Sequence, residues 1–576
     1  MADRLLSLAT QGLREPGGKA VSAARTVPAP AAGSAQPTVR RLIVYTLLFA
    51  LVVVAAIGLS GLMGRLLGAG TVVAGGDVAG LARSLAFTLI GGPMAAALWW
   101  FVWRRLEDPM ERQSVGWGLY LTIMYAVALI TATSWLLGAL ASVAGGEWQG
   151  WQLSLSNGLV WAGVLAWHRW MLRHPRKSPV LMPDVPIVVG AFFGLIIGVG
   201  GTVTAMATLL DTAIRGFTAS ASVGEPWWRS VLQSLVWAAG GGAIWWWHWI
   251  HEAGRRLKTG FADVGLVVVG ILGAIILALG GIGTVLFVLL RLAFDRTDPV
   301  SELLEPLGAA MAAGAVGSLV WAYHRAVSLG RAAATLQAAK LVTSGVALAA
   351  AATGIGVVVN SVLSIAATPL AGSGTRALLL GGISALAVGG PLWWLTWKPG
   401  VPPEPTELGR RGRRVYLIAV FGLSAVVAVI TLLVIGYRVF EFVLGDVSGG
   451  SLVDRTRAPL GLLVATGLAA GYHFAVWRHD RALTAAAAPA RKRTVGKVIL
   501  VTAGDPEPLA RVAAEVTGAS VTVWIKADAG SSDATEGTAD ELPDRLASAL
   551  DGVAADRVLV VTGPGSRVEV IPLAPA

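Results

Sequence analysis

The stretch Gly91–Pro109, GGPMAAALWWFVWRRLEDP, ends an apolar run with three tryptophans and two arginines. A similar ending, GGPLWWLTWKPG, returns at Gly389–Gly400. Indole rings settle at the headgroup level of a bilayer, and arginine side chains extend past them to the phosphates. An apolar segment of about 20 residues that ends this way is typical of a helix that crosses a membrane and stops at its surface.

The composition indicates a membrane protein. Hydrophobic residues make up 55% of the 576-residue chain and charged residues only 14%, with a mean hydropathy of +0.68. Soluble chains average about 45–50% apolar and about 25% charged residues. The absence of cysteine excludes disulfides and thiolate catalysis. Membrane-spanning segments are expected near 41–63, 82–104, 115–141, 152–172, 187–211, 228–250, 263–292, 305–326, 343–367, 375–397, 414–438 and 458–478.

The basic residues predict the orientation of these segments. Most of the 45 Lys and Arg lie in the N-terminal part through Arg41, after every second apolar segment, and from Arg478 to Lys497. Loops rich in Lys and Arg stay on the cytoplasmic side of a membrane. We therefore expect six hairpins in the cell membrane and both termini in the cytoplasm. The bilayer is the expected partner, through anionic headgroups at its cytoplasmic face.

Helix endings recur at a nearly fixed spacing and indicate internal repeats. The motif WWxxW begins at positions 146 and then 148 residues apart, at Trp99, Trp245 and Trp393. A second ending combines an aromatic residue with His and Arg, and it begins at positions 156 and 154 residues apart, at Trp167, Tyr323 and Trp477. Three tandem copies of a four-helix unit are therefore expected, each made of two related hairpins.

These endings resemble a family of uncharacterised bacterial integral-membrane domains, catalogued as a domain of unknown function. Its four-helix copies end their second and fourth helices in Trp, His and Arg clusters, similar to LWWFVWRRLEDP, VLAWHRWMLRHP and WWWHWIHEAGRRL here. The resemblance implies a fold without an assigned activity. We define copy 1 as residues 40–177, copy 2 as 184–340 and copy 3 as 341–481. A flexible cytoplasmic tail, 1–39, is expected before them.

Residues 495–576 have the pattern of a soluble α/β domain. GKVILVTAG and ASVTVWIKAD predict strands, DPEPLARVAAEVTG and ELPDRLASALDGV predict helices, and a final hairpin is expected to turn at Gly563–Gly565. VTAGDPEP and TGPGS lack the motifs of phosphate-binding loops, so ordinary turns are expected there. The predicted fold class is an all-α polytopic membrane bundle of about twelve transmembrane helices with a small C-terminal α/β cytoplasmic domain.

The tryptophan-rich helix ends allow two interpretations. The rings and basic side chains can anchor each helix at its depth in the bilayer. Alternatively, they converge on a vestibule that faces the cytoplasm and binds an anionic lipid or another ligand. The candidate vestibule residues are Trp99, Trp103, Arg104, Trp167, His168, Arg169, Trp245, Trp249, His248, His324, Trp393 and Trp397.

All seven histidines lie at or just beyond the expected cytoplasmic helix ends. Hydrogen bonds to headgroups and water are expected for histidines beside Arg and Trp at an interface. Haem or metal ligation is the alternative, with His248 and His251 as the best pair. That pair lacks a complete ligand set, so neither a metal nor a cofactor is predicted.

No set of residues predicts catalysis, and the chain is not expected to be an enzyme. Nothing indicates a nucleic-acid partner, and no protein partner can be named. The leading hypothesis is a membrane scaffold or sensor that couples the bilayer to the cytoplasmic α/β domain. The alternative is a channel or transporter for an uncharged or lipidic substrate, because twelve helices in internal repeats also occur in transporters.

Overall fold

The computed structural model describes residues 35–574, except 69–76, 148–149, 218–225, 296, 368–372, 398–406, 446–450, 488–494, 504, 527–541 and 564–566. It divides into two compact units, residues 1–399 and 400–576. The first helix begins at Ala35, within the predicted tail, and the rest of that tail lies outside the described residues.

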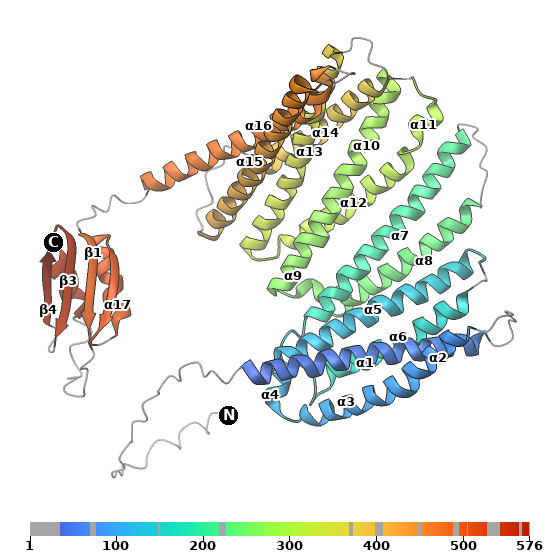
Figure 1. Ribbon diagram of the computed structural model, residues 1–576, viewed down its shortest axis with the longest axis horizontal. Helices are drawn as coiled ribbons and strands as arrows, with labels where there is room; N and C mark the ends of the chain where they lie inside the picture. Colours follow the sequence, from blue (N-terminus) through green and yellow to red (C-terminus); the bar gives the residue numbers. More distant parts are fainter. Residues whose placement is uncertain are drawn as a thin grey trace, which may run out of the picture. The chain divides into compact units, whose positions relative to one another are not determined.

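Helical hairpins build the first unit (Figure 1). Hairpin 1 pairs α1 (Ala35–Leu67) with a helix formed by α2 (Val78–Ala86), η1 (Phe87–Gly91) and α3 (Gly92–Arg105). Hairpin 2 pairs α5 (Val115–Ala144) with α6 (Trp151–Arg173), and hairpin 3 pairs α7 (Val185–Phe217) with α8 (Trp227–Trp246) and η2 (Trp247–His251). The short helix α4 (Pro109–Arg112) connects the first two hairpins.

Hairpins 4 and 5 continue the same pattern. Hairpin 4 pairs a helix formed by α9 (Gly260–Gly265), η4 (Leu266–Gly273) and α10 (Ala274–Phe294) with α12 (Leu307–Ser328). Hairpin 5 pairs α13 (Ala333–Ala367) with α14 (Ser373–Trp397). The short elements η3 (Gly254–Arg256) and α11 (Val300–Leu304) lie before and within hairpin 4.

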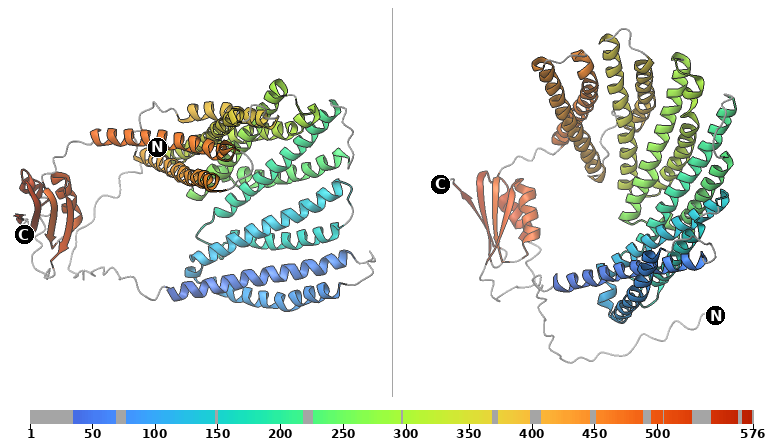
Figure 2. Two further views of the ribbon diagram at one scale, coloured as in Figure 1. Left: turned by 45° about the horizontal axis from the view of Figure 1, so that its top comes forward. Right: turned by 45° about the vertical axis from the view of Figure 1, so that its right-hand side comes forward.

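The five hairpins stand in a row, each packed on the next (Figure 2). Within a copy, the first helix packs on the fourth, as α1 does on α6 and α7 does on α12. Between copies, the third helix packs on the second helix of the next copy, as α5 does on α8 and α10 does on α14. The two packing patterns repeat, so copies 1 and 2 have the same internal architecture.

Ten helical stretches among the described residues are long and apolar enough to cross a membrane. Two of the twelve predicted spans, which correspond to α6 and α8, do not reach this hydropathy. Polar residues such as Asn157 in α6 and Gln233 in α8 lower their hydropathy. The predicted fold class is confirmed, with a helix count close to the expected twelve.

The second unit contains hairpin 6 and the α/β domain. Hairpin 6 pairs α15 (Glu407–Leu444) with α16 (Leu452–Ala487), and an Arg413–Asp480 ion pair of 2.7 Å joins the two helices. The domain follows in the predicted order: β1 (Val495–Thr502), α17 (Pro506–Thr517), β2 (Ser520–Ile525), α18 (Leu542–Leu550), β3 (Ala555–Gly563) and β4 (Arg567–Leu573).

The sheet of the α/β domain has the strand order β2-β1-β3-β4. Strand β1 runs parallel to β2 and β3, whereas β4 is antiparallel to β3. Alternate residues of β1 and β3, such as Val498 and Val558, form the core with Leu509 of α17 and Leu546 of α18. Most of the turn predicted at Gly563–Gly565 lies outside the described residues.

Candidate functional site

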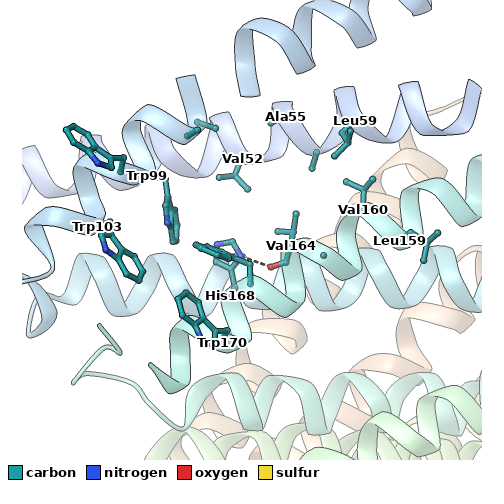
Figure 3. Close-up of a pocket in the computed structure, with 16 residues that line it drawn as sticks. Val52, Ala55, Leu59, Trp99, Trp103, Leu159, Val160, Val164, His168 and Trp170 are labelled. Carbon is teal, nitrogen blue, oxygen red and sulfur yellow. Dashed lines mark hydrogen bonds between the residues drawn. The ribbon is translucent and has the colours of Figure 1, made fainter. Parts of the chain in front are cut away.

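A groove of about 820 Å³ lies between α1, α3 and α6 of copy 1 (Figure 3). Five tryptophans and one histidine gather at one end of it, and small aliphatic residues form the rest. Four lining residues were predicted vestibule residues: Trp99, Trp103, Trp167 and His168. The other lining residues are Val52, Ala55, Ala56, Leu59, Ala95, Ala96, Trp100, Leu159, Val160, Gly163, Val164 and Trp170.

Copy 2 closes the corresponding seam because glycine replaces alanine on its second helix. Aligning the WWxxW motifs of the two copies pairs Ala95 of α3 with Gly241 of α8. A methyl group on Gly241 would lie 2.2 Å from the backbone nitrogen of Gly198 in α7. The backbones of α7 and α8 therefore touch, as small residues permit in packed membrane helices.

The first helices of the two copies differ in the same way. Gly58 of α1 and Gly201 of α7 each pack against the second helix of their hairpin, so we align these two glycines. The same alignment pairs Ala55 of α1 with Gly198 of α7. In copy 1, both sides of the seam thus carry a methyl group where copy 2 has none. We attribute the groove between α1 and α3 to these methyl groups.

The third wall of the groove also differs between the copies. Aligning Trp167 with Tyr323 pairs Gly163 of α6 with Leu319 of α12. A side chain added at Gly163 would meet no atom within 4 Å, so this glycine leaves open space in the groove. In copy 2, the matching residue is Leu319, whose side chain is 72% exposed.

His168 and its aromatic neighbours form the floor of the groove. The ring nitrogen Nδ1 lies 2.7 Å from the carbonyl oxygen of Val164, and because that oxygen only accepts, Nδ1 is the donor. The other ring nitrogen, Nε2, lies 3.2 Å from the hydroxyl of Tyr120. The Trp99 ring meets Trp167 and His168 edge-on, at centroid distances of 5.6 and 5.7 Å. Both ring nitrogens of His168 are engaged, so it has a fixed orientation.

Basic side chains flank the aromatic end of the groove. The Arg104 guanidinium lies over the Trp100 ring, 4.1 Å from its centroid. Lys177 lies 5.0 Å from the centroid of the Trp103 ring and donates a 2.8 Å hydrogen bond to the Trp103 carbonyl. Trp103 in turn stacks on Trp170 at 5.9 Å. The groove thus has apolar walls with Arg104 at its aromatic end, whereas Lys177 is buried and lies 3.7 Å from the Glu107 carboxylate.

The predicted vestibule residues do not share one cavity. Arg169 turns away from the groove toward copy 2, where it donates a 2.8 Å hydrogen bond to Glu252. Arg173 joins the same carboxylate at 2.5 Å, and the Nε2 atom of His248 lies 2.8 Å from the hydroxyl of Tyr125 in copy 1. These contacts join hairpins 2 and 3, and sequence reasoning missed both Tyr125 and Glu252.

The remaining predicted residues fill interfaces farther along the row. Trp245 meets Tyr323 edge-on at 5.8 Å, matching the Trp99–Trp167 contact of copy 1. Trp249 is buried and donates a 3.0 Å hydrogen bond to the Tyr323 hydroxyl. His324 is also buried, Trp393 packs in the cluster with Trp321, and Trp397 is buried in hairpin 5.

The expectation that the histidines bond to headgroups and water is wrong for four of them. His168, His248, His324 and His473 are between 0% and 4% exposed. Each is oriented by its Nδ1 atom, which donates to the carbonyl four residues earlier. The facing helices make room with small residues, as Gly190 does for His248 and Gly270 does for His324.

Two lining tryptophans, Trp100 and Trp170, were absent from the prediction. Each lies next to a predicted residue or three positions from one, so helical spacing was the available signal. For metals, no group of three His, Cys, Asp or Glu in the described part of the chain could hold an ion. His251 instead packs against the Trp247 ring, 4.4 Å away.

Comparison with known proteins identifies a family. No curated protein and no solved structure matches the chain. The family DUF5671, a domain of unknown function, matches residues 41–174, 184–315 and 337–468, which together cover more than half of the sequence. The chain therefore belongs to the DUF5671 family and carries three tandem copies of its domain.

Proposed function

We propose that the protein is a membrane sensor or scaffold whose first repeat binds a lipid and whose α/β domain responds to the bilayer. The observation that carries this proposal is the groove of copy 1, because its walls come from three separate helices of the repeat. The corresponding seam of copy 2 is closed by glycine contacts. Because α1 and α6 are both walls of the groove in copy 1, binding or release of a lipid there would change how these two helices pack.

The chemistry of the groove favours an anionic lipid. Its volume of about 820 Å³ falls within the range of ligand pockets, about 300–1,000 Å³. Aliphatic residues such as Val52 and Val160 suit an acyl chain, and the five tryptophan rings suit the boundary between chain and headgroup. Arg104, which is exposed beside Trp100 at the aromatic end, is the basic residue that would meet a lipid phosphate.

The channel or transporter hypothesis lacks an observation of this kind. The described helices of the first unit form a row of hairpins and do not surround a central axis (Figure 1). Lipid binding is therefore the function to test first.

Filling the groove from within provides the test. Gly163→Leu places in copy 1 the residue that copy 2 carries at position 319, and the site has room for it. Gly200→Leu is the matched control, because Gly200 is also exposed on a membrane helix with open space around it. Native mass spectrometry of purified protein should detect retained anionic lipid in the wild type and in Gly200→Leu. Retention should fall at least tenfold in Gly163→Leu.

Two further measurements decide whether lipid binds in the groove and whether Arg104 contacts its headgroup. Equal retention in Gly163→Leu and Gly200→Leu, with both variants folded by circular dichroism, would contradict binding in the groove. Arg104→Gln should keep the lipid but remove the preference for anionic over zwitterionic headgroups. An unchanged preference would show that the basic end does not contact the phosphate.

A further inference from the structure

In the described part of the α/β domain, one face of the sheet has no covering layer. Helices α17 and α18 pack against each other and against the same core residues, so both lie on one face. Side chains alternate along a strand, and the residues between the core positions point to the opposite face. No described element packs there. Parallel sheets are usually covered on both faces, so this open face is unusual.

The open face is apolar across its centre. The strand register aligns Ile499 of β1 with Leu559 of β3, and Leu559 with Ile571 of β4. The next row joins Trp524 of β2, Val501 and Val561. Trp524 is 63% exposed, which is a large exposed area for an indole ring. An apolar patch of this kind marks an interaction surface.

Among the described strand residues, the charges at the ends of the open face are mostly positive. Lys497 and Arg557 are paired neighbours at one end, and Arg567 lies at the other. All three are exposed, and none takes part in an ion pair of the described residues. Glu569 is the acidic residue of this face, opposite Val561 in the register. The described strand residues of this face therefore carry more positive than negative charge.

The short connection keeps the α/β domain close to the end of α16. Residues 488–494 separate the end of α16 from the start of β1. A connection of this length spans at most about 30 Å, so the domain stays at a high effective concentration beside the bilayer. The connection also contains Arg491, Lys492 and Arg493.

We propose that the open face docks on anionic lipid headgroups of the leaflet next to the end of α16. Trp524 enters the headgroup layer, and Lys497, Arg557 and Arg567 contact lipid phosphates. The chemistry of aromatic and basic residues at a bilayer surface favours this occupant. The proposal rests on the proposed coupling of bilayer and domain, but it does not require a lipid in the groove.

The cysteine-free chain allows a direct test in the full-length protein. Thr522→Cys places one label on the open face, and Glu515→Cys places one on exposed α17 as the matched control. Each variant carries a fluorophore and is held as a single chain in a nanodisc with quencher-labelled lipid. We expect strong quenching at position 522 in anionic discs, weak quenching in zwitterionic discs, and weak quenching at position 515 in both.

The variant Lys497→Gln/Arg557→Gln/Arg567→Gln should reduce quenching at position 522 to its zwitterionic level. Equal quenching at positions 522 and 515 would overturn the proposal. In detergent, shielding of the label at position 522 from a soluble quencher to an extent that rises with protein concentration would indicate that a second copy of the chain covers the face. That result would also overturn the proposal. Shielding of position 522 from a soluble quencher that disappears when residues 1–34 are deleted would indicate that the N-terminal segment covers the face. This result would overturn the proposal as well. Lipid retention is measured separately, so groove binding and docking can fail independently.

Discussion

Copies 1 and 2 share one architecture but differ at the seam between their first two helices. In copy 2, Gly198 and Gly241 bring the backbones of α7 and α8 into contact. In copy 1, Ala55 and Ala95 occupy these positions, and a groove lies between α1, α3 and α6. Alanines thus line the groove of copy 1, whereas glycines at the matching positions of copy 2 bring two helix backbones together. The proposed lipid site therefore lies in the copy whose first two helices are held apart by methyl groups.

The buried histidines of the two copies differ as well. His168 of copy 1 has Tyr120 beside its Nε2 atom, whereas Gly270 occupies the space facing His324 in copy 2. The Nε2 atom of His324 has no hydrogen-bond partner among the described residues. Copy 1 is therefore the more fully hydrogen-bonded of the two at this position.

The largest effect is expected at the junction that holds the two copies together. Glu252→Gln removes the carboxylate between Arg169 and Arg173 and leaves Arg169 without its counterion. The loss should be about 3 kcal/mol of unfolding free energy, the low end for breaking a buried pair, because Arg169 keeps 26% exposure. Thermal unfolding in mild detergent measures it, with Glu107→Gln as the control, because the Glu107 carboxylate is 77% exposed and lies at a longer 3.7 Å from its partner Lys177. Equal effects of the two changes would show that the junction is not held by charge.

A pair of opposite substitutions tests the seams directly. Gly241→Ala in copy 2 forces a methyl group against the α7 backbone and should cost about 1–3 kcal/mol, as overpacking does. Ala95→Gly in copy 1 creates no clash and should cost about 1 kcal/mol, the helix preference of alanine over glycine. Chemical denaturation of both variants gives the comparison. A larger loss for Ala95→Gly than for Gly241→Ala would contradict the account of the seams.

The smallest effect concerns the start of the second helix in each copy. Asp77 accepts a 2.8 Å hydrogen bond from the Gly80 amide and pairs with Arg65 at 3.0 Å, whereas α8 begins without a side-chain cap. The Gly80 hydrogen bond, followed by Arg65, holds the pKa of Asp77 below its ordinary value. The cap is therefore present above the ordinary carboxyl pKa, about 3.9, and is lost as the pH falls through the lowered pKa.

Hydrogen exchange across this pH range can detect the cap. Protection of the first turn of α2 should fall on acidification in the wild type, while the first turn of α8 should show no matching step. Asp77→Ala should lower the protection of α2 already at neutral pH. An equal loss of protection in the first turns of α2 and α8 would show that the loss does not come from the Asp77 cap.

Much of this architecture follows from patterns in the sequence. The WWxxW spacing alone indicates three copies, because each motif marks the end of an equivalent helix. The α/β domain was predictable because its strands and helices have distinct periodicities and clear stops, such as Gly518 after α17. Local signals of this kind depend only on neighbouring residues.

The groove and the buried histidines depend on pairings between helices. Nothing local distinguishes Ala95 from any other alanine until α3 is placed against α1. The burial of His248 likewise depends on Gly190, which lies 58 positions earlier in the chain. The Arg169–Glu252 pair was missed because both residues belong to apparently exposed helix ends in different copies. Such features require the register of one helix on another.

Crosslinking a photoactivatable anionic lipid to the wild-type protein tests the central claim most directly. The lipid carries its reactive group on the acyl chain, and crosslinked peptides are identified by mass spectrometry after irradiation in nanodiscs. The account predicts that peptides from α3 and α6 are labelled far more than the equivalent peptides from α8 and α12, and that Gly163→Leu removes the excess. Equal labelling of the two copies, or an excess that survives Gly163→Leu, would contradict it.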